Sequence, residues 1–571
     1  MTTKIASTTL ITLPVEILRS IAHLLLRSDL PAVSARGHLL EESYVDVLRD
    51  WVYPNPLPLT ACTPSLPCLT RRGARSGQTR VCYRGDRGPT RSAFDLLYVC
   101  RHLRRTLSED TLFWAEGLLL HPYRLNDALQ FALAAEQPRL SFVGHGGACI
   151  CVLEQLVPRL SITKRLDLAL PSTDLLDRSP SRRIQEELIR GAPLLEHVDL
   201  RFDWAHARED AVKKTIVLLP KILTVRLMNS TFVLGGDMLT SLYIACEETA
   251  FRWPRVDIYK LLRFCRNLVI LSLQMCFVDV EELPHVTQSQ YPDAGFVVLS
   301  KLRYLHLSDR PLEWSQASSA FDLPPACHVH ADVILPMSDS RDYSIDAMRL
   351  DIERAIDNSR IFNIGFYHRI MVLRLQDTGT LNHAWQWPEY MTVAFGDTAE
   401  DALSFRDPHA SSASGSFGVR NSAFSLLSVE TPWMHIRNDG IRLQRVLDNF
   451  LRACRDLGLR YVETLVLDIS RMQTPINSWQ SMLIELPNVR RITVLGPTSF
   501  RARPVTELAV ALGTRQETID DGGHYLCPLL QSIYVPNACD AVPQEMIGRL
   551  DISLGGRRNP ASGCTPVLWK V

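Results

Sequence analysis

The sequence predicts an α/β protein in which a small helical module precedes a long region of alternating strands and helices. Two observations predict this fold. From about residue 160 onward, an apolar residue, two others, an apolar residue, one other and an apolar residue recur, as in LEHVDL at 195–200. The closing apolar-x-apolar step has the two-residue period of a strand with one face in the core. Segments of helical period precede several of these strands, so crossover connections and a parallel sheet are expected.

The first expected element is an amphipathic helix that begins near Pro14. Proline suits the first helical turn, because its fixed φ is helical and its missing N–H would be unpaired there. Glu16 follows in the same turn, where the helix dipole favours an anion. Leu13, Ile17 and Ile21 recur at four-residue spacing and predict one apolar stripe. The helix is expected to end between residues 28 and 31.

A second helical segment is expected about seventy residues later. Val99, Leu103 and Leu107 form its apolar stripe, and three arginines among them are expected to face solvent. Phe113 and Trp114 close the segment. Periodicity alone would also allow two unrelated amphipathic helices that pack into a common core.

The order of the residues in both segments resembles the F-box. The matching features are Leu-Pro-x-Glu-Ile, Asp-Leu after the first helix, Val-Cys-Arg before a basic helix, and then Leu-Phe-Trp; they cover 13–30 and 96–114. In that family the motif docks a protein onto the Skp-type adaptor of a cullin ubiquitin ligase. The resemblance implies that the adaptor-binding module is formed by Leu13, Pro14, Ile17, Ile21, Leu30, Val99, Cys100, Leu103 and Trp114.

The sequence departs from the family in the long link between the two parts of the motif. We expect residues 8–40 and 93–118 to form the two parts, and residues 41–92 to be a disordered insert, because this stretch is rich in Pro, Arg, Gly, Ser and Thr and has no apolar period. A tenfold longer flexible link adds only about 2 kcal/mol of closure entropy, so the two parts can still meet. An alternative is that residues 41–92 are a translated intron.

The recurring strand pattern resembles leucine-rich repeats, in which L-x-x-L-x-L is followed three positions on by Asn or Cys. Only LVILSLQMC meets that last requirement, through Cys276, and the spacing swings from 17 to more than 60 residues. We therefore expect an irregular, curved α/β solenoid over residues 119–550 and an irregular tail over 551–571. A doubly wound α/β domain is the alternative, although no Gly-rich turn follows any of the strands. The first apolar positions of the pattern are Leu195, Ile222, Leu239, Leu268, Leu302, Ile370, Val462, Val489 and Leu530.

The strand pattern also predicts a binding face. The middle residue of each apolar-x-apolar step must point away from the core, and repeat proteins commonly bind extended partners on the exposed face of the sheet. The mixed chemistry of these residues suits a protein better than a phosphate or a metal. The candidate substrate face consists of Asp199, Arg226, Tyr243, Ser272, His306, Arg374, Thr493 and Tyr534.

Composition narrows the class of function. The chain of 571 residues has 62 basic and 62 acidic residues, and this balance argues against nucleic acid and anionic membranes as partners. The 14 cysteines include no C-x-x-C pair, which suits a reducing compartment, and no stretch is apolar enough for a membrane span. We expect a cytoplasmic or nuclear protein. No nucleophile is paired with a base, and we expect no catalysis, cofactor or metal.

Together with the F-box resemblance, these patterns predict the substrate-recognition subunit of a cullin ubiquitin ligase. The resemblance implies a Skp-type adaptor and a cullin scaffold as partners, together with a target protein that the pattern does not name. One alternative is a binding scaffold outside any ligase, with a vestigial F-box. A second is an α/β enzyme, which would need a convergent pocket of titrating residues.

Overall fold

The chain is a mixed α/β protein with a largely parallel sheet, as the alternation of strands and helices predicts. The expected insert at 41–92 and Leu30 lie outside the residues that the computed structural model describes. Those described residues are 13–29, 95–119, 125–147, 155–170, 180–202, 214–246, 249–278, 297–318, 320–324, 327–334, 372–377, 389–396, 425–431, 462–468, 476–495, 502–513, 515–516, 524–534 and 568–570.

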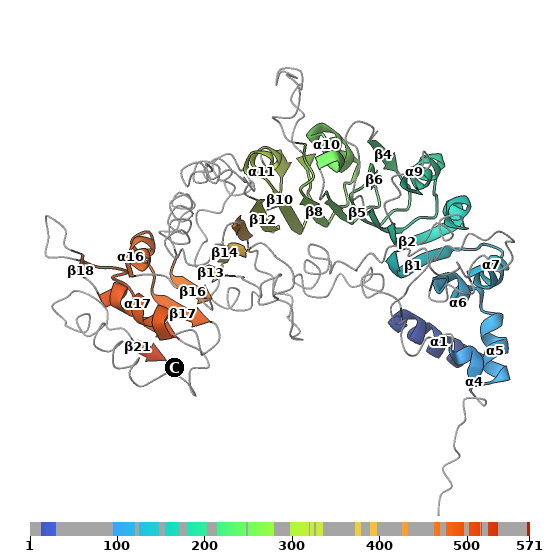
Figure 1. The fold of residues 1–571 in the computed structure, drawn as a ribbon, viewed down its shortest axis with the longest axis horizontal. Coiled ribbons are helices and arrows are strands. Elements are labelled where there is room, and N and C mark those ends of the chain that lie inside the picture. The colour runs from blue at the N-terminus through green and yellow to red at the C-terminus, as the bar shows by residue number, and fades with distance from the viewer. Residues whose placement is uncertain are drawn as a thin grey trace, which may run out of the picture. The chain divides into compact units, whose positions relative to one another are not determined.

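Contacts divide the chain into two units, with the boundary between Leu271 and Ser272, inside strand β8 (Ile270–Gln274). Each unit is described by itself (Figure 1). The helices of unit 1 are α1 (Val15–Asp29), α4 (Leu96–Val99), α5 (Arg101–Ser108), α6 (Thr111–Glu116), α7 (Leu125–Leu133), the 3₁₀ helix η6 (Val157–Ile162), α9 (Pro180–Arg190), the 3₁₀ helix η8 (Thr249–Phe251) and α10 (Arg255–Phe264).

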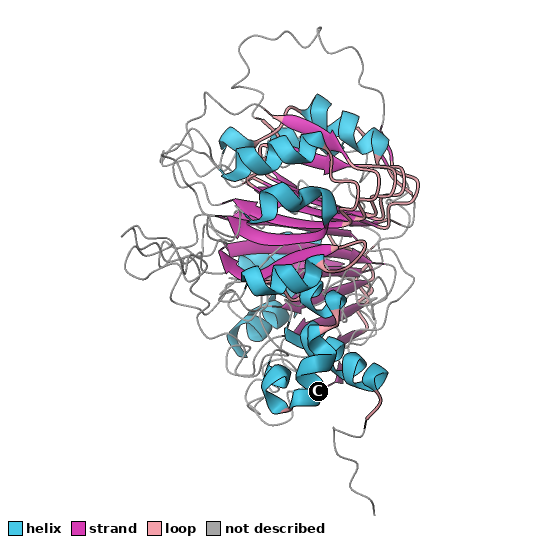
Figure 2. Cartoon of the chain, turned by 90° about the vertical axis from the view of Figure 1, so that its right-hand side faces the viewer, coloured by secondary structure: helices cyan, strands magenta, loops and turns pink. Residues whose placement is uncertain are grey.

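The main sheet of unit 1 has the strand order β1-β2-β3-β5-β7, and each neighbouring pair is parallel. A second parallel pair is formed by β4 and β6. Figure 2 shows the strands from the side of unit 1, lying one beside the next. The strands are β1 (Leu140–Gly147), β2 (Thr163–Leu170), β3 (His197–Phe202), β4 (Thr215–Leu218), β5 (Thr224–Met228), β6 (Phe232–Gly235) and β7 (Ser241–Ala245).

One face of this sheet is the core of unit 1. Its register aligns apolar side chains across β2, β3, β5 and β7, and Leu168, Leu200, Leu227 and Ile244 form one such row, each at most 1% exposed. Burying an aliphatic side chain of this size stabilises a fold by roughly 1.5–3 kcal/mol. Phe202 continues this face and packs edge-to-face on Phe232 of β6, with ring centroids 6.0 Å apart. The apolar face therefore lies toward β4 and β6.

A turn recurs before the strands and explains the first apolar residue of the sequence pattern. In unit 1 the backbone N–H of Leu195 donates to Ala192 O at 3.1 Å, and that of Leu239 donates to Gly236 O at 3.1 Å. In unit 2 the N–H of Leu302 donates to Leu299 O at 3.0 Å. The first apolar residue of these three patterns thus closes a turn and points into the core, where the three leucines are at most 1% exposed.

A second backbone feature fixes the register between successive strands. The carbonyl of Glu196 accepts the N–H groups of both Leu223 and Thr224, at 2.8 and 3.1 Å. Leu223 O accepts in the same way from the next strand start in unit 1, and Glu463 O and Arg490 O do so in unit 2. One carbonyl therefore accepts two successive N–H groups at several strand starts in both units, although the segments between these strands differ in length.

Unit 2 continues the α/β pattern with one reversal. Its strand order runs β10-β12-β15-β14-β13-β16-β17-β20-β21, in which β14 is antiparallel to both of its neighbours and every other neighbouring pair is parallel. The strands β13 and β14 are neighbours in sequence order and pair in antiparallel orientation. The strands of the main sheet are β10 (Tyr304–Asp309), β12 (His328–Ile334), β13 (Val372–Asp377), β14 (Glu389–Gly396), β15 (Ser425–Thr431), β16 (Thr464–Asp468), β17 (Arg491–Leu495), β20 (Ser532–Tyr534) and β21 (Leu568–Lys570).

The tail at 551–571 was expected to be irregular, and this was wrong for its end, because β21 pairs in parallel with β20. A strand of three residues is too short to give an alternation signal in sequence. The other elements of unit 2 are β9 (Val297–Val298), α11 (Pro311–Ser318), β11 (Phe321–Asp322), α16 (Ile476–Ile484), α17 (Ala502–Gly513), β18 (Arg515–Gln516) and β19 (His524–Tyr525).

Two adjacent glycines at the end of β6 give a test of this packing. A Cβ at Gly236 would overlap the backbone oxygen of Leu219, whereas one at Gly235 would overlap the end of the Leu261 side chain. A side-chain end can move more easily than a backbone oxygen. We expect Gly236→Ala to lower the free energy of unfolding by about 1–3 kcal/mol, and Gly235→Ala to lower it less. Denaturant unfolding of both variants measures the order, and the reverse order would contradict the close approach of β6 to the turn before β5.

Candidate partner-binding surfaces

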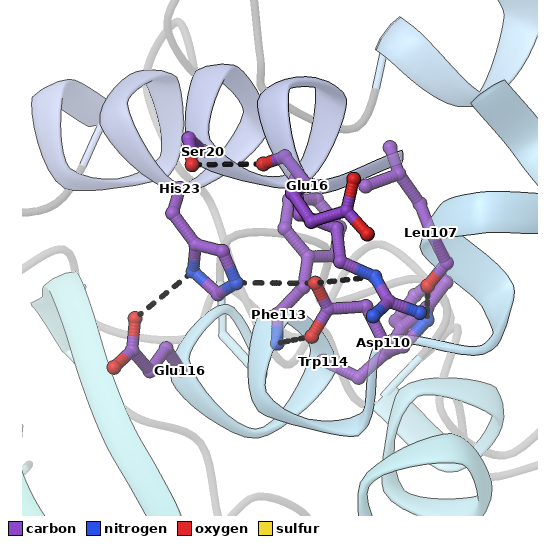
Figure 3. A network of polar contacts seen from close by, with 9 residues as sticks. Glu16, Ser20, His23, Leu107, Asp110, Phe113, Trp114 and Glu116 are labelled. Carbon is purple, nitrogen blue, oxygen red and sulfur yellow. Dashed lines mark hydrogen bonds and ion pairs between the residues drawn. The ribbon is translucent and has the colours of Figure 1, made fainter. Parts of the chain in front are cut away.

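The two separated halves of the N-terminal motif pack together into one helical module, formed by residues 13–29 and 95–119. Figure 3 shows the polar contacts that join α1 to α6. His23 Nε2 lies 3.2 Å from Asp110 Oδ2, and His23 Nδ1 lies 3.6 Å from Glu116 Oε2. Arg19 Nε adds an ion pair of 3.7 Å with the same oxygen of Asp110. Side chains 87 residues apart in sequence therefore meet in one network.

Asp110 has two functions in this network. Its other oxygen, Oδ1, accepts the backbone N–H of Phe113 at 3.1 Å and caps the N-terminus of α6. A side-chain cap of this kind typically contributes about 1 kcal/mol. The carboxylate that starts α6 is thus the same group that pairs with His23, so the second half of the motif presents a fixed anion to the first.

The network shifts the pKa values of its members. Hydrogen bonds to Asp110 and then to Glu116 favour the protonated imidazole and raise the pKa of His23 from 6.5 to about 9, although burial acts in the opposite direction. Burial would raise the pKa of Asp110, but the hydrogen bonds from His23 and from the Phe113 N–H outweigh it and lower that pKa. His23 is therefore a cation at neutral pH.

Apolar contacts complete the module. Leu18, Ala22 and Leu26 of α1 are at most 1% exposed, and Phe113 is fully buried with its ring 6.0 Å from that of His23. Trp114 Nε1 donates to Leu107 O at 2.8 Å. The stripe that the sequence predicts on α1 is not the buried one, because Ile17 is 46% exposed. The helix has apolar residues on more than one side, and spacing alone does not show which side the rest of the module covers.

The nine predicted adaptor-binding residues fall into four groups. Leu103 and Trp114 are buried in the module, and Leu13, Ile21 and Cys100 are half-buried. Leu30 lies outside the described residues. The exposed group is Pro14, Ile17 and Val99, the last at 55%.

Other apolar side chains of the module are also exposed, although the adaptor-binding set inferred from the sequence does not include them. Leu24 is 65% exposed, Tyr98 is 58% exposed and Leu112 is 52% exposed. Exposed apolar side chains therefore come from both halves of the motif. Val99, the neighbour of Tyr98, was part of the predicted stripe. Tyr98 and Leu112 would be found by a search for apolar residues that remain after the core residues are assigned.

The second candidate surface is the other face of the sheet in unit 1. The register aligns Asp167 of β2 with Asp199 of β3, Asp199 with Arg226 of β5, and Arg226 with Tyr243 of β7. Neighbouring strands lie about 4.8 Å apart, so these four side chains form one row across the sheet. The three that the sequence named do share a face, as the pattern predicts.

The expected exposure of this face was wrong for most of the predicted residues. Side chains on one face of neighbouring parallel strands lie side by side and cover one another, so a residue can point away from the core and still be buried. Tyr534 is 40% exposed, and the side chain of Arg374 lies outside the described residues. The buried members are Asp199, Arg226, Tyr243, Ser272, His306 and Thr493, which range from 0 to 8% exposed.

Charges gather at the centre of the row in unit 1. Arg201 Nε and Nη2 each donate to one oxygen of Asp199, both at 3.3 Å. Arg226 Nη1 lies 3.5 Å from Asp199 Oδ2, and its guanidinium lies 5.0 Å from the centroid of the Tyr243 ring. Burial, and then the charge of Asp199, raise the pKa of Asp167 to about 8.

Sequence reasoning missed Asp167 and Arg201. Asp167 lies between Leu166 and Leu168, which is the same apolar-x-apolar step as in the later strands, so applying the pattern upstream of Leu195 would have found it. Arg201 shares a face with Asp199 because the two are separated by two positions in a strand. In unit 2, Ser272 Oγ lies 2.8 Å from His306 Nδ1, so these two predicted residues also meet.

In the described parts of the chain, no helix is both long and apolar enough to span a bilayer. Among the same residues, no group of three His, Cys, Asp or Glu side chains could hold a metal ion. No protein-family model matches the chain, and no curated protein matches it. Function is therefore inferred from the residues and contacts described above.

The raised pKa of His23 predicts how the packing of α1 depends on pH. A group whose pKa is higher in the folded state stabilises that state fully below its unfolded pKa, here 6.5, and loses the contribution as the pH rises through about 9. We expect His23→Gln to weaken hydrogen-exchange protection of α1 by about 1–2 kcal/mol at pH 6, after solvent screening is considered. The difference from the unmodified protein should shrink toward pH 9. A difference that stays constant with pH would contradict the charged network.

Proposed function

We propose that the protein is the substrate-recognition subunit of a cullin-type ubiquitin ligase. In this proposal the helical module docks on the Skp-type adaptor, and the repeat region, an irregular leucine-rich-repeat-like solenoid, binds a target protein. The subunit itself catalyses nothing. Its contribution is to hold the target close to the conjugating enzyme, which raises the effective concentration of the reacting groups.

One observation carries the proposal: the two parts of an F-box-like motif, separated by a long insert, pack into one module that leaves apolar side chains exposed. Two unrelated helices would have no need to share the His23–Asp110 contact, which spans 87 residues of sequence. The F-box resemblance and this packing are independent, since the first comes from residue order and the second from side-chain contacts.

The division of the motif residues supports docking through the exposed group. Leu103 and Trp114, at 2% and 4% exposed, hold the module together and have almost no apolar surface left for a partner. Ile17 and Val99, at 46% and 55% exposed, have apolar surface left for a partner. Full burial of two such side chains contributes roughly 3–6 kcal/mol of the gross binding energy at about 1.5–3 kcal/mol each, so these two positions are where adaptor binding is most sensitive.

A charge at either position tests the proposal. We expect Ile17→Asp and Val99→Asp each to abolish co-purification with a Skp-type adaptor, because burial of an unpaired carboxylate opposes docking. Both positions are exposed, so thermal unfolding should stay unchanged within about 0.5 kcal/mol. Ile189→Asp in α9 is the matched control, since Ile189 is 54% exposed and lies outside the module. It should bind the adaptor like the unmodified chain.

The double substitution of Leu13 and Pro14 by Ala gives a second arm. Pro14 O accepts the N–H groups of Ile17 and Leu18, both at 3.1 Å, and the pair forms the start of α1. We expect loss of co-purification with the repeat region still folded. Unchanged co-purification of every variant would remove the ligase proposal. Failure of the unmodified chain to bind any adaptor would favour the scaffold outside a ligase.

A further inference from the structure

The centre of the polar face in unit 1 contains an arginine whose hydrogen-bonding capacity is not used. The side chain of Arg226 is only 4% exposed. Neither Nη1 nor Nη2 has a hydrogen-bond partner, and the contact of Nη1 with Asp199 is an ion pair of 3.5 Å without hydrogen-bond geometry. A buried guanidinium with unmet donors is costly to a folded protein, so its presence here calls for an explanation beyond stability.

The nearest carboxylate is already engaged by another arginine. Both oxygens of Asp199 accept from Arg201, one from Nε and one from Nη2. The other aspartate of the row, Asp167, has its pKa raised to about 8 by burial and by the charge of Asp199, so it is mostly uncharged at neutral pH. Arg201 and Arg226 both lie beside the carboxylate of Asp199, so positive charge is in excess around it.

The guanidinium of Arg226 is also held in place. It lies over the ring of Tyr243, with 5.0 Å from the guanidinium carbon to the ring centroid. Stacking on an aromatic ring fixes the plane of a guanidinium. A donor group that is fixed before binding loses less side-chain entropy when a ligand arrives. Arg201, with 16% of its side chain exposed, and the half-buried Asp167 border the site. Nη1 and Nη2 of Arg226 are themselves covered, so a ligand reaches them only when a neighbouring side chain moves aside.

We propose that Arg226, with Arg201 and Tyr243, binds the carboxylate of an aspartate or glutamate in a segment of the target protein. The planar carboxylate matches the two unused nitrogens in a bidentate pair, and its single charge matches the excess of the cluster. A phosphate group would bring nearly two negative charges. The inference rests on the proposed function, because it names the chemistry by which the target would be bound.

Three peptides and one substitution test the site in the full chain. The probe is a rhodamine-labelled decapeptide of Ser and Gly with two Glu residues, compared with matched peptides that carry Gln or phosphoserine at those positions. Binding is measured by fluorescence anisotropy at 150 mM salt. We expect the Glu peptide to bind at least tenfold more tightly than the Gln peptide, and Arg226→Met to remove that difference.

The thermal stability of Arg226→Met separates a binding role from a structural one. Replacement of a buried charge by an apolar side chain of similar size is often neutral or stabilising when the charge is not needed for the fold. We expect the midpoint of unfolding to stay constant or to rise. Arg190→Met in α9 is the matched control, because that side chain is 69% exposed, and it should change neither binding nor stability.

Each other outcome overturns the inference. Equal binding of the Glu and Gln peptides, or unchanged Glu binding by Arg226→Met, would remove the site. If the phosphoserine peptide binds tenfold more tightly than the Glu peptide, the ligand of the site is a phosphate group and not a carboxylate. A lower unfolding midpoint for Arg226→Met would assign the residue to the fold. Co-purification with the adaptor is measured in parallel. A chain that binds the adaptor but does not prefer the Glu peptide refutes only this inference. A chain that prefers the Glu peptide but does not bind the adaptor refutes the ligase proposal.

Discussion

The sheet depends on one backbone constraint, which is the carbonyl that accepts two successive N–H groups at the start of the following strand, as at Glu196, Leu223, Glu463 and Arg490. Because one carbonyl takes two successive N–H groups from the following strand, the register cannot slip by one residue. A slip of one residue would exchange the two faces of the sheet. With the register fixed, leucines fall into rows on one face and polar residues into rows on the other, and both the core and the Arg226 cluster follow from this.

The helical module depends on a different interaction. Asp110 is held by its hydrogen bond with the N-terminus of α6. The helix α1, which contains His23, is held in the module by the burial of Leu18, Ala22 and Leu26. The ion pair then selects one rotation of α1 about its axis, in which Ile17 faces outward. Apolar burial thus holds α1 in the module, and the charged contact decides which of its apolar residues remain available to a partner.

Much of the fold could be predicted from the sequence. The strands at LEHVDL, ILTVRL and LTSLYI lie where the pattern puts them, since a buried aliphatic row needs the same residues in each repeat. The face shared by Asp199, Arg226 and Tyr243 also follows from alternation. Their burial does not, because it depends on the length of neighbouring side chains across strands and not on any one strand. The outward direction of Ile17 likewise depends on a contact with α6, which is distant in sequence.

The packing of α1 has a consequence for how the chain can be assembled. The contacts of α1 described above join its side chains to the segment that contains α5 and α6, and none of them requires a covalent connection near Asp29. A chain cleaved between Asp29 and Asp95 should therefore keep α1 bound as a non-covalent complement, and the two pieces made separately should reassociate into one module. The length of the intervening segment is then free to vary between related proteins without any change in the surface that the module offers.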